Sequence, residues 1–147
     1  MKIYLDSSDI SVIKEIDKRF DIKGFTTNPT LMRKAGIKDV VSFGRKLNEI
    51  AVDRSVSYEV VSDDSSSVIQ EARKLNSLGD NVSVKVPVVT SLGKSNLDLI
   101  CSLLNEEISI NITAVLSKNQ INKVCQAVGK RTDTRQKVIL SIFCGRI

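Results

Sequence analysis

Residues 81–89 read NVSVKVPVV, an apolar segment with a lysine at its centre. The segment is typical of a β-strand, in which successive side chains point to opposite faces. Three valines then share one face, while Ser83 and Lys85 share the other. The fold therefore depends on what this polar face meets: solvent, as in a half-exposed sheet, or an enclosed polar space.

Strand-like segments recur along the whole chain and alternate with helical patterns. Besides the one near Asn81, they begin near Lys2, Gly24, Ser55, Ile108 and Val138. Their starts lie about 22 to 31 residues apart, which suits a strand, a helix and two short loops. Segments such as residues 8–20 (SDISVIKEIDKRF) carry apolar residues at helical spacing. The alternation predicts a parallel sheet with right-handed crossovers, in a single domain over residues 1–147.

Each predicted strand has one apolar and one polar face, and two architectures compete for this pattern. A doubly wound sheet is disfavoured because the first βα turn (LDSSD) lacks GxGxxG, and GxxxxGK[ST] is absent from the sequence. A half-exposed sheet is the plain alternative, but intervening helices normally cover such a sheet. We therefore predict a (β/α)8 barrel. Its lumen is lined near the mouth by Asp6, Thr26, Asn28, Glu59, Lys85, Asn111, Thr113 and Ser141.

The composition narrows the possible chemistry. The 147 residues include no His, which excludes Ser-His-Asp and Cys-His catalytic sets and His-containing zinc sites in this chain. The three cysteines form neither a CxxC pair nor a disulfide framework, so we expect idle thiols, no metal site and a cytoplasmic location. No apolar run approaches the ~20 residues that span a bilayer, so we expect no membrane association, and the N-terminus predicts no signal peptide.

The net charge of +5 comes from 22 Lys and Arg against 17 Asp and Glu. These residues are scattered and aromatic residues make up only 4% of the chain. Solvated helix faces explain this pattern better than a nucleic-acid surface, so we expect no nucleic-acid partner. Anionic small molecules remain compatible with the charge.

Lys85 is the most informative residue because apolar neighbours flank it on both sides. Burial in a barrel removes hydration from an ammonium group and favours the neutral amine. A neutral amine attacks carbonyls to form a Schiff base, whose iminium eases cleavage of the neighbouring C–C bond. The alternative is a structural lysine paired with Asp6 or Glu59. From periodicity alone both interpretations stay open.

Other side chains fit chemistry on a phosphorylated sugar. Asp6 and Glu59 supply carboxyl groups for general acid–base work. The hydroxyl and amide groups predicted in the lumen are types that hold a polyhydroxylated substrate. Arg146, just beyond the sixth predicted strand, is a candidate phosphate ligand because a guanidinium binds phosphate bidentately. Taken alone, a terminal arginine is more often plain surface.

Six segments along the chain resemble one family. They are MKIYLDSSD (1–9), GFTTNPTLM (24–32), VSYEV (56–60), VKVPVVTSLG (84–93), ISINITAVLS (108–117) and SIFCGRI (141–147). In this order they are similar to the small transaldolase family that includes fructose-6-phosphate aldolase. The resemblance implies a (β/α)8 barrel and cofactor-free class I aldol transfer. It also implies sugar-phosphate substrates, with transfer of a dihydroxyacetone unit in the pentose phosphate pathway, and we expect a homo-oligomer.

The resemblance also implies catalytic roles at matching positions. Lys85 in VKVP corresponds to the Schiff-base lysine, and Asp6 in YLDSSD to the acid–base that handles the hydroxyl proton during cleavage. Glu59 in VSYEV and Thr113 in INITAV correspond to the pair that positions a catalytic water.

Substrate-binding positions carry over in the same way. Asn28 in TTNP and Asn111 in INIT correspond to ligands of the dihydroxyacetone hydroxyls, with Thr26 nearby. Ser141 corresponds to a contact with a substrate hydroxyl, and Arg146 in GRI to a phosphate-binding arginine.

Two positions favour one branch of the family. Members that act as free aldolases tend to carry Gln at the place of Glu59 and Tyr at the place of Phe143. This chain therefore resembles transaldolases, with fructose-6-phosphate aldolase activity as the alternative. A catalytically silent sugar-phosphate-binding or assembly module is a further alternative.

The chain is shorter than a complete barrel of this type. A complete (β/α)8 barrel needs about 200 residues, so we expect a barrel truncated to about six βα units. The chain is then a fragment of a longer protein, a partner or second copy completes its sheet, or a truncated relative serves as a binding module. We favour the fragment.

Overall fold

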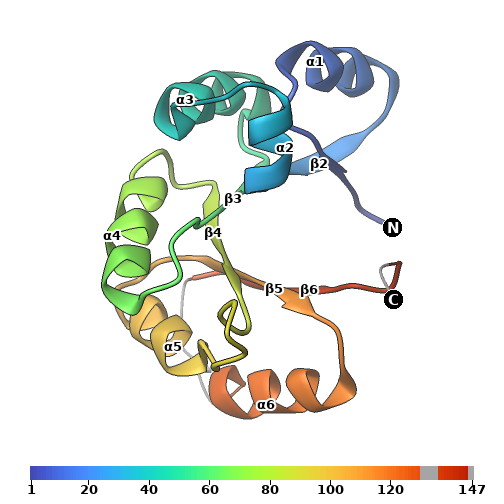
Figure 1. Ribbon diagram of the computed structural model, residues 1–147. Coiled ribbons are helices and arrows are strands. Elements are labelled where there is room, and N and C mark those ends of the chain that lie inside the picture. The colour runs from blue at the N-terminus through green and yellow to red at the C-terminus, as the bar shows by residue number, and fades with distance from the viewer. Residues whose placement is uncertain (130–135, 146–147) are drawn as a thin grey trace.

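The computed structural model describes residues 1–129 and 136–145, which form one six-stranded parallel sheet and its covering helices (Figure 1). The strands are β1 (Ile3–Asp6), β2 (Ile22–Thr26), β3 (Ser55–Glu59), β4 (Val82–Pro87), β5 (Ile110–Val115) and β6 (Val138–Ile142). The helices are α1 (Ile10–Arg19), α2 (Pro29–Lys34), α3 (Val40–Ala51), α4 (Ser65–Asn76), α5 (Leu97–Asn105) and α6 (Lys118–Val128).

The strands lie side by side in chain order from β1 to β6, and every neighbouring pair is parallel. The sheet curls, so that helices follow its convex side while β1 and β6 flank an open side (Figure 1). This curled half-barrel confirms the predicted α/β fold of (β/α)8 TIM-barrel type, truncated to about six βα units. Among the described residues no helix is long and apolar enough to cross a membrane.

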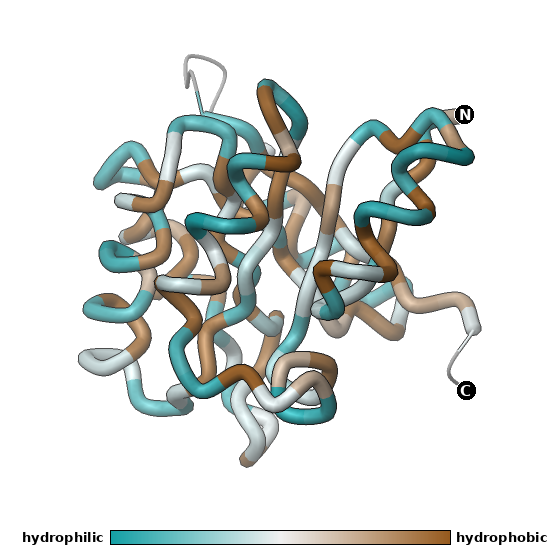
Figure 2. Tube along the Cα trace, turned by 90° about the horizontal axis from the view of Figure 1, so that it is seen from above, coloured by the Kyte–Doolittle hydropathy of each residue, from teal (hydrophilic) through white to brown (hydrophobic). Residues whose placement is uncertain are grey.

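The apolar faces of the strands form the core together with the helices. Val56, Val84 and Ile110 from the sheet are fully buried, as are Leu47 of α3 and Leu103 of α5. Figure 2 shows hydrophilic residues on the outward sides of the helices and hydrophobic residues on the sides that turn toward the sheet. Burial of apolar surface at about 25 cal/mol per Å² is therefore what holds the helices to the convex face.

Side-chain caps determine where the helices begin. Asp9 accepts from the backbone N–H groups that start α1. Asp39 and Asp64 do the same for α3 and α4. The short helix α2 has no counterpart among the predicted helices, because six residues are too few for a periodic pattern. Asn28 begins it by accepting from the N–H of Leu31 at 3.0 Å.

A cluster around Arg54 joins α1, α3 and β2 at the N-terminal end of the strands. The guanidinium of Arg54 binds both carboxylate oxygens of Asp17 and donates to the carbonyls of Ile50, at 2.7 Å, and Ala51. It also lies over the ring of Phe25, 4.8 Å from the centroid. These contacts satisfy the last carbonyls of α3 and hold the pKa of Asp17 below its ordinary value, chiefly through the hydrogen bonds to Arg54.

The Arg54 cluster predicts a pH-dependent stability. Asp17→Asn should lower the free energy of unfolding near neutral pH by about 1–3 kcal/mol, because the ion pair is less than one third exposed. Since the pKa of Asp17 is lower in the folded protein, its contribution is present above the unfolded pKa of about 3.9 and is lost as the pH falls below it. Urea unfolding between about pH 7 and about pH 3 should show the two proteins converging. Glu15→Gln, in the exposed α1 pair with Arg19, is the matched control and should change little. A constant difference across the pH range would contradict the prediction.

Gly24 provides a second test, because a side chain has no room there. A Cβ at this position would lie 2.3 Å from the Tyr4 ring and 2.6 Å from the carbonyl oxygen of Ser55. The second contact is with backbone, so Gly24→Ala should lower the free energy of unfolding by about 1–3 kcal/mol. Gly145→Ala, which adds a methyl in open space, should be neutral in the same urea titration. Equal stability of the two variants would contradict this packing.

Candidate active site

A cavity of about 550 Å³ opens at the C-terminal ends of the strands. Its lining includes the predicted lumen residues Asp6, Thr26, Asn28, Glu59, Lys85, Thr113 and Ser141. Pro29, Ala114 and Phe143 add apolar surface to the same cavity. The polar faces that were predicted strand by strand thus meet at one place, where barrels of this type carry their chemistry.

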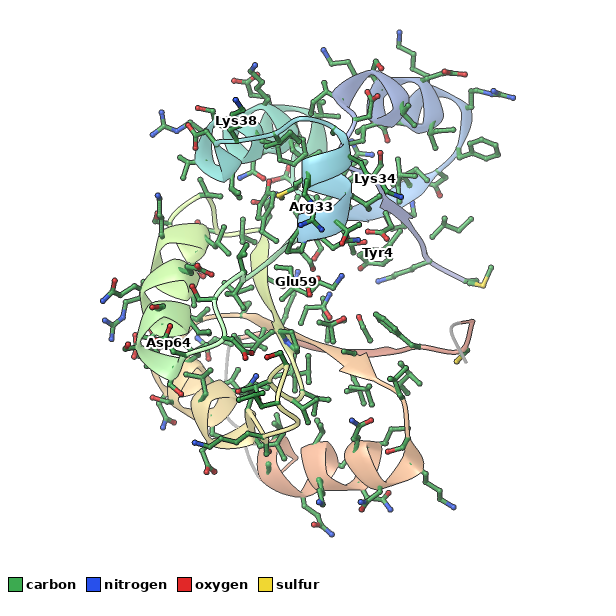
Figure 3. The ribbon with its side chains drawn as sticks, in the orientation of Figure 1. Tyr4, Arg33, Lys34, Lys38, Glu59 and Asp64 are labelled. Carbon is green, nitrogen blue, oxygen red and sulfur yellow. The ribbon has the colours of Figure 1, made fainter. Side chains whose placement is uncertain are left out.

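Lys85 lies at the base of the cavity and is only 7% exposed. Its Nζ is 3.2 Å from Oε2 of Glu59 and donates to the carbonyl oxygen of Thr27 at 3.4 Å. Register explains the first contact, because Glu59 of β3 pairs directly with Lys85 of β4. Of the two acids left open as partners, the structure therefore pairs Lys85 with Glu59, which Figure 3 places on the concave side of the sheet.

Asp6 faces the cavity from β1, at the open side of the half-barrel. Its Oδ1 accepts a hydrogen bond of 2.8 Å from the hydroxyl of Thr26, the residue in register with it on β2. Two strands, β2 and β3, separate Asp6 from Lys85. The cavity consequently presents a carboxylate and an amine from different sides, with space for a ligand between them.

Asn28 contributes a donor to the cavity. Its side-chain oxygen is occupied as the cap of α2, at 3.0 Å from the N–H of Leu31. The amide N–H groups of Asn28 remain for other partners, and the residue lines the cavity. The same cap therefore fixes the orientation of this donor.

A bulge at the end of β5 shapes another wall. Ala114 has a φ of 56°, in the left-handed region, and the pairing of β5 with β6 shifts between Ile112 and Val115. Both Thr113 and Ala114 line the cavity, while Val115 returns to the core. The buried Oγ1 of Thr113 has no hydrogen-bond partner among the described residues, so it is free to bind a ligand or water.

Asn111 differs from the other predicted site residues because it does not line the cavity. It is buried, its amide nitrogen donates to Ser57 Oγ at 3.1 Å, and its oxygen accepts from Ser141 Oγ at 2.7 Å. The residue thereby links β3, β5 and β6 beneath the cavity. Its role toward substrate stays a prediction, and Arg146 lies outside the described residues.

Sequence reasoning missed the carbonyl of Thr27, which accepts from Lys85. A backbone acceptor carries no side-chain signal, and only the turn forced by Asn28 and Pro29 points to it. In the part of the chain that the structure describes, no group of three or more His, Cys, Asp or Glu side chains is arranged to hold a metal ion.

Comparison with known proteins identifies the family of this chain. A family model described as Transaldolase/Fructose-6-phosphate aldolase matches residues 3–147. The chain belongs to this family. The match extends over every strand of the half-barrel, so the family covers the whole candidate site.

Several curated relatives carry the name probable transaldolase. The protein from Thermoplasma volcanium is 37% identical over 145 residues, which cover 92% of this chain and 63% of that protein. The protein from Nitrosopumilus maritimus is 38% identical over 122 residues, covering 82% of this chain and 51% of that protein. The protein from Thermoanaerobacter sp. is 35% identical, with coverages of 82% and 53%. The chain thus spans about half the length of most of the curated relatives it matches.

The geometry of Asn111 predicts a structural effect of its removal. Asn111→Ala should lower the free energy of unfolding by about 1–3 kcal/mol, since it breaks one buried and one part-buried hydrogen bond and leaves Ser57 and Ser141 without their partner. Urea unfolding measures this loss. Asn119→Ala, on the exposed side of α6, should show no loss, and an Asn111 variant as stable as this control would contradict the bridging role.

Proposed function

We propose that Lys85 is the Schiff-base lysine of a transaldolase-type site, which transfers a dihydroxyacetone unit between sugar phosphates. The observation that carries this proposal is the burial of the Lys85 amine at the base of the cavity that Asp6 and Thr113 also line, 3.2 Å from Glu59. Membership of the transaldolase/fructose-6-phosphate aldolase family supports the general class. Because the chain spans about half of its relatives, the activity of the whole protein belongs to the proposal too.

The proposed reaction begins at the nitrogen of Lys85. The neutral amine adds to the ketose carbonyl and water leaves, which forms an iminium. Asp6 then accepts the proton of the hydroxyl on the carbon beyond the scissile bond. The C–C bond breaks, the aldehyde product departs, and the electron pair of the broken bond forms the C=C bond of an enamine that stays attached to the Lys85 nitrogen. The enamine then adds to an acceptor aldehyde, whose oxygen takes the proton back from Asp6. Hydrolysis of the new iminium releases the product and completes the transfer.

The surrounding groups suit these steps. Glu59, in contact with Lys85, is placed to take the proton that makes the amine nucleophilic. Thr113, whose hydroxyl is unpartnered among the described residues, and Glu59 line the same cavity. This supports the proposal that the two side chains together bind and orient a water. The amide N–H groups of Asn28 are free to donate to substrate hydroxyls.

Transfer is favoured over free aldolase activity by Phe143, whose backbone N–H donates to the carbonyl of Val115 at the end of β5. Phe143 lines the cavity without a hydroxyl, so it offers no proton to quench the enamine before an acceptor arrives. Fructose-6-phosphate aldolase activity requires such quenching and is the second candidate. The pentose phosphate pathway and a homo-oligomeric state remain proposals.

Borohydride trapping tests the proposal on the 147-residue chain. Incubation with fructose 6-phosphate and borohydride should add a reduced sugar at Lys85, located by peptide mass spectrometry. Lys85→Met should lose the adduct, and Lys94→Met, at an exposed loop lysine, should retain it. Thermal stabilisation by the sugar phosphate without any adduct would instead indicate a silent binding module.

A further inference from the structure

The lumen beneath Lys85 is lined by small hydroxyl side chains, where barrels of this type usually carry bulky branched residues. Together with Thr26, which lines the cavity itself, they form what we call the lumen row, which consists of Thr26, Ser57, Ser83 and Ser109. Thr26 is in register with Ser57, and Ser57 with Ser83. Ser109 lies next to Ser83, because Val84 pairs with the following residue of β5 and donates to the Ser109 carbonyl at 2.8 Å.

The two central hydroxyls of the lumen row are buried without a full set of partners. Ser57 and Ser83 are each 1% exposed. Among the described residues the Oγ of Ser83 has no hydrogen-bond partner at all. The Oγ of Ser57 accepts from Asn111, and its own proton finds no acceptor there. Buried polar groups of folded proteins are nearly always paired with protein or water, because an unpaired one destabilises the folded state.

The geometry identifies what pairs them. Neighbouring strands lie about 4.8 Å apart, so the Ser57 and Ser83 hydroxyls can reach one small molecule between them. That molecule must accept from Ser57, it must pair with the Ser83 hydroxyl in either direction, and it must fit where serine stands in place of a branched apolar side chain. Water meets all three conditions. We infer that a buried water binds between Ser57 and Ser83, beneath Lys85.

This water has a place in the reaction, a role that rests on the proposed function. Lys85 follows Ser83 by two residues on the same face of β4, about 6.6 Å along the strand. When the amine attacks the ketose carbonyl, it loses its contacts with Glu59 and with the backbone oxygen of Thr27. The water, held between Ser57 and Ser83, then keeps the lumen beneath the amine polar. Ser83 is accordingly a positioning residue, which acts on Lys85 through this water.

A pair of isosteric variants tests the water without relying on activity. Ser83→Thr keeps the hydroxyl, and Ser83→Val has the same shape without it. If the water is bound, the Val variant loses a buried hydrogen bond and leaves the water short of a partner. Its unfolding equilibrium constant in urea should then exceed that of the Thr variant by about 5- to 30-fold. Equal stability, or a more stable Val variant, means a dry lumen and overturns the inference.

Diffraction gives a direct measurement on the unaltered chain. Density for a water within hydrogen-bond distance of both Ser57 Oγ and Ser83 Oγ is expected in a crystal structure at about 1.5 Å resolution or better. Direct contact between the two hydroxyls, or side chains that close the gap, would overturn the inference even if a variant failed to fold.

The role toward Lys85 is tested separately by the rate of borohydride trapping with fructose 6-phosphate. The Val variant should form the Lys85 adduct at least several-fold more slowly than the Thr variant, and the order should hold at saturating sugar phosphate. Equal rates would overturn the positioning role and leave the water in place. Absence of an adduct in the unaltered chain would overturn the proposed function, while the stability comparison still decides the water.

Discussion

The burial of one charged side chain organises the candidate site. A lysine inside a barrel is tolerated only where oxygen atoms replace the water that it loses. Here those atoms come from the Glu59 carboxylate, at the end of β3, and from the Thr27 carbonyl, in the turn that follows β2. The parallel register between β3 and β4 sets the carboxylate opposite the amine, so sheet pairing and site electrostatics depend on the same alignment.

The two ends of the strands have different tasks. At the N-terminal end, Arg54 ties α1, α3 and β2 together through an ion pair, carbonyl contacts and an aromatic ring. At the C-terminal end, Asp6, Glu59 and Lys85 face a cavity with few contacts to one another. Stabilising interactions are therefore concentrated away from the polar groups that a substrate would meet, as is usual for barrels with chemistry at one mouth.

Alternation along the strands was enough to predict the fold class and the set of polar residues at the cavity, because strand faces follow a strict period of two. Alternation could not decide whether Asp6 or Glu59 pairs with Lys85, since that depends on the register between strands. It also could not separate Asn111, whose hydrogen bonds are internal, from its neighbours that line the cavity. The Arg54 cluster was missed because its partners are mostly carbonyls, and α2 because it is shorter than two turns.

The left-handed backbone at Ala114 interrupts the alternation of side chains between the two faces of β5. Ile110 and Ile112 obey the alternation, and then Val115 is in the core after a step of three. An insertion or loss of a single codon at this point would exchange the inner and outer faces of everything that follows in the strand. In proteins that share this half-barrel, the number of residues at this point is consequently expected to vary less than their identity.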